Sequence, residues 1–127
     1  MADVVVGAGT AVRGSPTFQP VVQLTIPGGS AVSQSLDCQG WRIGAIYTDG
    51  SFAGTALYLQ ASHDDQSWFD VYDRDGRLTW FDVGPNRSLA APFDVVYTYN
   101  LVRFVSNTSQ GAGTPTVLTV VLEPARR

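Results

Sequence analysis

The sequence predicts an all-β domain: an antiparallel β-sandwich of about eight short strands, jelly-roll-like, that follows an extended N-terminal arm. Residues 55–73, TALYLQASHDDQSWFDVYD, alternate apolar and polar side chains on both sides of an acidic turn, as a β-hairpin requires. Similar short apolar segments recur along the chain between turn residues and without a helical period. Lysine is absent and Glu123 is the one glutamate, so the residues typical of exposed helices are almost missing. Two packed sheets would let both inner faces share one core.

Residues 1–20 differ in composition from the rest of the chain. Val4, Val5 and Val6 are suited to a short strand. The glycines and prolines that follow prevent a long regular element. We therefore expect residues 1–20 to form an extended arm and residues 21–127 to form the sandwich domain.

The strands expected in the domain follow one another at short intervals. They are residues 21–26, 31–36, 41–47, the two arms of the 55–73 hairpin, 77–83, 97–107 and 116–123. Residues 84–95 read as irregular, and the glycine-rich NTSQGAGTP segment at 107–115 reads as a flexible loop. The side chains expected in the core are Leu24, Ile26, Trp41, Ile43, Leu57, Leu59, Val71, Phe104, Leu118 and Val120.

Length, cysteine content and charge limit the classes of function. At 127 residues the chain suits one domain, and its single cysteine, Cys38, allows neither an internal disulfide nor a multi-cysteine zinc site. The net charge is −3 and no basic cluster precedes the terminal Arg126-Arg127, so we expect no nucleic-acid partner. The N-terminus lacks the pattern of a signal peptide, and no apolar run is long enough to span a bilayer. We expect synthesis in the cytoplasm and no membrane partner.

Two acidic segments resemble metal sites in part. Residues 70–76 place three aspartates before a glycine, as calcium loops do, but the closing glutamate of a complete loop is missing. Residues 63–65, His-Asp-Asp, have no second histidine or cysteine nearby. Aspartate and glycine also supply ordinary turn geometry, so we predict hairpin turns at both places and no metal or cofactor.

Catalytic patterns are equally weak. His63 is the one histidine, no serine lies in a G-x-S-x-G turn, and a Cys38–His63 pair has no local support. Paired aspartates for glycoside hydrolysis are conceivable, but these aspartates fall in predicted turns. We predict a protein that is not an enzyme. Trp80 and Phe81 are adjacent in a predicted strand and face opposite ways, so one of them is available for a partner.

The order of elements resembles that of small virion proteins of tailed bacteriophages. The segments that carry this resemblance are LYLQASHDDQSWFDVYDRDG, YNLVRFVSNTSQGAGTP and the closing TVLTVVLE, within residues 20–123. In that group a strand ending in ASxD leads through a polar turn to an aromatic strand ending in YDxDG. The hairpin is also similar to that of discoidin-type carbohydrate-binding sandwiches, although SHDDQSW here lacks the glycine of their SxDGxxW turn.

The phage resemblance implies a non-enzymatic structural protein that decorates or cements the capsid by binding the major capsid protein lattice. It implies a location on the capsid surface of the virion, synthesis in the host cytoplasm, and a homo-oligomer, with a trimer favoured. The candidate interface residues are Val4, Val5, Val6, Phe18 and Trp80. Two alternatives are a tail or fibre component, and a carbohydrate-binding module that exposes Trp68 or Trp80.

Overall fold

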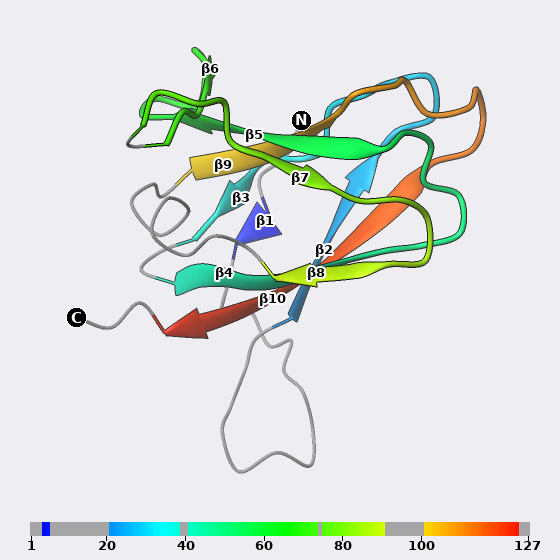
Figure 1. Ribbon diagram of the computed structural model, residues 1–127, viewed down its shortest axis with the longest axis horizontal. Helices are drawn as coiled ribbons and strands as arrows, with labels where there is room; N and C mark the ends of the chain where they lie inside the picture. Colours follow the sequence, from blue (N-terminus) through cyan, green and yellow to red (C-terminus); the bar gives the residue numbers. More distant parts are fainter. Residues whose placement is uncertain (1–3, 6–20, 39–40, 74, 91–100, 125–127) are drawn as a thin grey trace, which may run out of the picture.

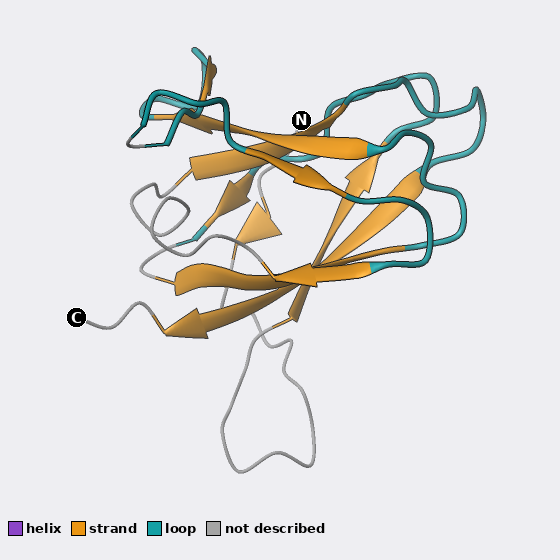
Figure 2. Cartoon of the chain, in the orientation of Figure 1, coloured by secondary structure: helices purple, strands orange, loops and turns teal. Residues whose placement is uncertain are grey.

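The computed structural model describes residues 4–5, 21–38, 41–73, 75–90 and 101–124. Within these residues all regular structure is β-strand (Figure 2), and no helix is long and apolar enough to cross a membrane. The strands are β1 (Val4–Val5), β2 (Val21–Ile26), β3 (Leu36–Asp37), β4 (Trp41–Thr48), β5 (Ala56–Ser62), β6 (Phe69–Asp70), β7 (Trp80–Asp82), β8 (Ser88–Ala90), β9 (Leu101–Ser106) and β10 (Thr116–Pro124).

The strands pair as if one long hairpin had been rolled into two sheets. β2 pairs with β10, β3 with β9, β4 with β8 and β5 with β7, and all four pairs are antiparallel. Further antiparallel pairing of β10 with β4 and of β9 with β5 completes the layers. One sheet has the order β2-β10-β4-β8, and the other has β1-β3-β9-β5 with β6 and β7 on the far edge of β5. This order confirms the predicted jelly-roll sandwich, and Figure 1 shows β5, β7 and β9 in one layer above β4, β8 and β10.

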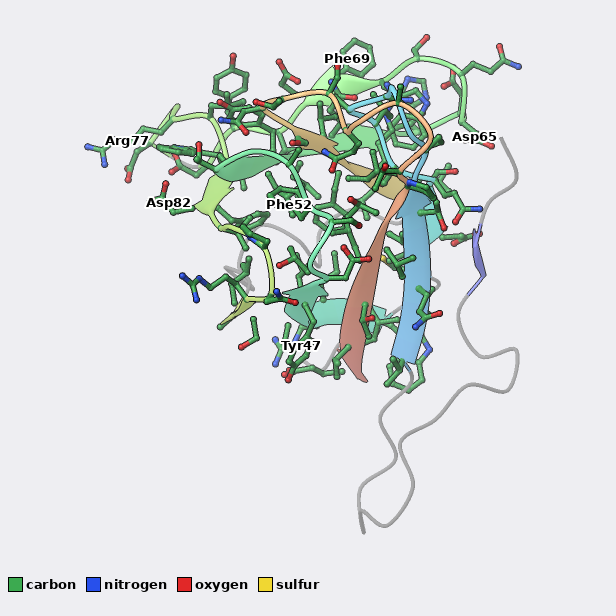
Figure 3. The ribbon with its side chains drawn as sticks, turned by 90° about the vertical axis from the view of Figure 1, so that its right-hand side faces the viewer. Tyr47, Phe52, Asp65, Phe69, Arg77 and Asp82 are labelled. Carbon is green, nitrogen blue, oxygen red and sulfur yellow. The ribbon has the colours of Figure 1, made fainter. Side chains whose placement is uncertain are left out.

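The core lies between the two sheets and is built from the inward positions of their strands. Nine of the ten predicted core side chains are buried, and the tenth, Trp41, is partly buried and packs against the cluster. Phe52 and Phe81 were not predicted to be in the core, and both are buried. Figure 3 shows Phe52 between the sheets. The period-two alternation in β2, β5, β9 and β10 therefore identified the inner faces correctly.

Two strand predictions need correction. Residues 88–90, predicted to be irregular, form β8 and pair with β4 through Ala45↔Ala90 and Tyr47↔Ser88. A three-residue strand is too short to show alternation, and it forms here because the edge of β4 supplies its hydrogen bonds. Residues 31–36, predicted to be a strand, contribute the start of β3 and one isolated bridge, Val32↔Val105. Residues 97–100 of the predicted 97–107 strand lie outside the described residues.

The 107–115 loop is held to the rest of the domain by the buried side chain of Gln110. Its Oε1 accepts hydrogen bonds from the Ala53 N–H and the Thr116 hydroxyl, each at 2.8 Å. Its Nε2 donates to the Ala53 carbonyl at 3.0 Å. Asn107 adds a further bond, because its Oδ1 accepts from the Thr55 N–H at 2.9 Å. The loop between β9 and β10 is thereby joined to the loop between β4 and β5.

Candidate functional site

The outer face of the six-stranded sheet carries two neighbouring rows of side chains. Tyr58 and Gln60 lie on β5 two residues apart, so they share the outward face and are separated by about 7 Å. Tyr58 pairs with Trp80 on β7 and with Val105 on β9, which gives an aromatic row. Gln60 is the centre of a second row, described next. The register of β5 with its neighbours thus sets both rows.

The polar row consists of Asp70, Gln60 and Arg103, which pair across β6, β5 and β9. The Gln60 Nε2 donates to Oδ1 of Asp70 at 2.9 Å, and the Arg103 Nε donates to Oε1 of Gln60 at 2.8 Å. The Trp68 ring lies over the guanidinium, with its centroid 4.4 Å from the Arg103 Cζ. These contacts fix the orientation of the Arg103 side chain.

A hollow of about 160 Å³ opens beside Arg103. Its lining residues are Ser33, Ser35, Asp65, Trp68 and Arg103. Partial burial lowers the pKa of Arg103, and the negative charge of Asp65 opposes that effect. Because arginine keeps its proton in proteins, the hollow presents a cation and a carboxylate together. It offers both donors and acceptors with little net charge.

The aromatic row exposes the indole of Trp80. Trp80 is 52% exposed, whereas the neighbouring Phe81 is 6% exposed and packs in the core, so Trp80 is the available member of the pair. The Tyr58 and Trp80 rings have centroids 6.2 Å apart and are tilted by 37°. Tyr58 therefore packs beside the indole on the β5 side.

The segment from β6 to β7 forms a hairpin at the edge of β5 and carries two further exposed aromatic residues, Phe69 and Tyr72. Phe69 stacks on His63 with centroids 6.5 Å apart and an interplanar angle of 11°. A second, largely apolar hollow of about 160 Å³ adjoins this pair. Figure 3 shows Phe69, Arg77 and Asp82 around the six-stranded sheet, with Tyr47 on the opposite one.

The acidic segments form turns, as predicted. Oδ1 of Asp64 accepts hydrogen bonds from the Gln66 and Ser67 N–H groups at 2.9 Å each, and these bonds lower the pKa of Asp64 to about 2. Oδ1 of Asp73 accepts from the N–H groups of Asp75 and Arg77. Among the described residues, no group of three or more histidine, cysteine, aspartate or glutamate side chains is arranged to hold a metal ion.

The other candidate residues are spread over the fold. Cys38 is fully buried, and burial, with a smaller effect from the charge of Asp37, raises its pKa to about 12, so its thiol stays protonated. Val4 and Val5 form β1, which pairs in parallel with β3. Val6 and Phe18 lie outside the described residues.

Sequence reasoning did not find Gln60 or Arg103. Both are polar side chains at outward positions between buried neighbours, so alternation places each of them on a solvent face. Their contact depends on the register of β5 with β9, which sequence alone does not give. A carbohydrate-binding module was expected to expose Trp68 or Trp80. Trp80 is exposed, and Trp68 is half-buried over Arg103.

Comparison with known proteins gave a likeness in structure. No family model matches the chain, and no curated protein sequence matches it. The fold is similar to that in the crystal structure of the SPBc2 prophage-derived protein YomS, with a TM-score of 0.54 and 14% sequence identity. The match covers 86% of this chain and 98% of YomS. At that identity the likeness is one of fold alone.

Proposed function

We propose that this protein is a non-enzymatic structural protein of a bacteriophage virion, which decorates the capsid by binding the lattice of the major capsid protein. The observation that carries the proposal is the fold match to the prophage-derived YomS, which extends over nearly the whole of that chain. The resemblance of the 20–123 segment to small phage virion proteins rests on the sequence alone and supports the same role.

The pairing of β1 with β3 supports a role for the N-terminal arm in attachment to the capsid. Val4 and Val5 add a short parallel strand to the β3 edge of the six-stranded sheet. A segment that starts at a sheet edge can extend a contact surface beyond the globular face. We place Val6 and Phe18 in the contact of the arm with a neighbouring subunit of the capsid lattice. We also propose a homo-oligomer, for which a trimer is favoured.

The test is the number of copies of this chain in purified particles of the phage that encodes it, measured by quantitative mass spectrometry against the major capsid protein. Copies on the scale of the capsid lattice are expected. A handful of copies per particle would assign the protein to the tail or fibre instead, and its absence from particles would overturn the virion role.

The arm is tested separately, by adding purified protein to particles that lack it. The double variant Val6→Ala, Phe18→Ala leaves the β1 residues in place, and we expect it to bind at least tenfold more weakly than the unmodified protein. A deletion of residues 1–20 should abolish binding while the melting transition of the sandwich remains. Binding that is unchanged in both variants would refute the role of the arm.

A further inference from the structure

The outer face of the six-stranded sheet combines features that suit a polyhydroxylated ligand. Trp80 offers a flat apolar surface, held from one side by Tyr58. The C–H face of a sugar ring packs on such a surface, as apolar groups pack on aromatic rings generally. The polar row of Asp70, Gln60 and Arg103 borders the aromatic row, since it begins about 7 Å away along β5.

The polar row is held in place before any ligand binds. Gln60 uses one amide hydrogen on Asp70 and its oxygen on Arg103, and Trp68 covers one face of the guanidinium. Since these side chains are already ordered, binding would cost little conformational entropy. The terminal nitrogens of Arg103 can donate, and Oδ2 of Asp70 can accept. Sugar hydroxyls act as donor and acceptor alike, so they can use both groups.

The charges of this face argue against a polyanion. Asp65, Asp70 and Asp82 lie on or beside it, and Arg103 is the cation at its centre. Phosphate backbones and strongly acidic chains would meet these carboxylates at close range. A neutral ligand meets no such penalty.

From these observations we infer that the face formed by Trp80, Tyr58, Gln60, Asp70 and Arg103 binds a neutral glycan. A sugar ring stacks on Trp80, and the hydroxyls of the same or the next ring bond to the polar row. The hollow beside Arg103 receives the following unit. This inference does not depend on the capsid-binding role.

The test uses the full chain on an array of neutral and acidic oligosaccharides, followed by titration calorimetry with the neutral oligosaccharide that binds best. Trp80→Ala should raise the dissociation constant at least tenfold, and Arg103→Lys, which keeps the charge but loses the Nε bond and the planar stack, at least fivefold. The matched control is Tyr47→Ala, which removes an aromatic side chain that is 45% exposed on the opposite sheet. It should change the dissociation constant less than twofold.

Three outcomes would overturn the inference. These are no binding to any neutral glycan on the array, an equal loss of binding in the Trp80 and Tyr47 variants, and a Trp80→Ala variant that binds glycans normally but no longer binds particles. The last result would make this face a protein interface. The melting temperature of each variant shows whether a loss of binding comes from unfolding.

Discussion

The replacement of Thr79 by valine should stabilise the protein. Thr79 directly precedes β7. Its N–H donates to the Val71 carbonyl at 2.8 Å, and its carbonyl accepts from the Leu59 N–H. The residue is 6% exposed, and among the described residues its Oγ1 is the one buried side-chain polar atom without a hydrogen-bond partner. A buried hydroxyl without a partner costs roughly 1–3 kcal/mol. Valine has nearly the same shape and is also β-branched, so the strand geometry is unaffected.

Two contributions determine the expected gain in the free energy of unfolding. Removing the unpaired hydroxyl recovers part of its desolvation cost, and the new methyl group contributes about 0.8 kcal/mol if it is fully buried. We expect the free energy of unfolding to rise by about 1–2 kcal/mol, and the melting temperature by roughly 3–10 °C for a domain of this size. Urea unfolding followed by tryptophan fluorescence measures the change, and the m-value should stay constant.

The matched control is Thr48→Val on β4. Thr48 is 8% exposed, but its hydroxyl donates to the Gly84 carbonyl at 2.6 Å and accepts from the Arg87 N–H at 3.0 Å. The same chemical change should therefore lower the free energy of unfolding by about 1–3 kcal/mol, because it leaves two backbone groups unpaired. If Thr79→Val lowered stability, or if both variants shifted it in the same direction, the reasoning from hydrogen-bond partners would be refuted.

Three further predictions follow from the buried and hydrogen-bonded groups. Gln110→Ala should lower the free energy of unfolding by about 2–4 kcal/mol in urea unfolding, since it removes the bonds to Ala53 and Thr116; a change below 0.5 kcal/mol would contradict this. Cys38 should not react with a thiol reagent in the native state and should react fully in denaturant, because burial raises its pKa to about 12. The Asp64 carboxyl should titrate near pH 2 by NMR: its folded pKa lies below the usual 3.8, so its stabilisation of the turn is complete above pH 3.8 and is lost as the pH falls through 2.

The sequence was sufficient for the layers of the fold and insufficient for its contacts. Alternation in residues 21–26, 56–62 and 116–123 identified inward positions because a half-buried strand has a period of two. It failed at β8, whose three residues have no readable period and depend on the edge of β4. Pairing across strands is a long-range property. The sequence therefore could not predict the contact between Gln60 and Arg103, which are 43 positions apart.

The same limit applies to the candidate site. Trp80 could be singled out because two adjacent aromatic residues in a strand face opposite ways, and the structure shows which of them is exposed. The support that Tyr58 gives to Trp80, and the stacking of Trp68 on Arg103, depend on the register and on the fold of the 63–68 turn. Local propensity specifies neither of them.

The start of the arm and Trp80 lie on opposite edges of one sheet. The order β1-β3-β9-β5-β6, with β7 also pairing with β5, places them four strand spacings or about 19 Å apart, although the polar row extends from β5 to Arg103 on β9. Residues as far apart as those of β1 and Trp80, with no shared partners, act nearly independently. The deletion of residues 1–20 should therefore abolish binding to particles and leave glycan affinity within twofold, whereas Trp80→Ala should do the reverse. A variant of either kind that lost both activities while keeping its melting temperature would show that the two edges serve a single interface.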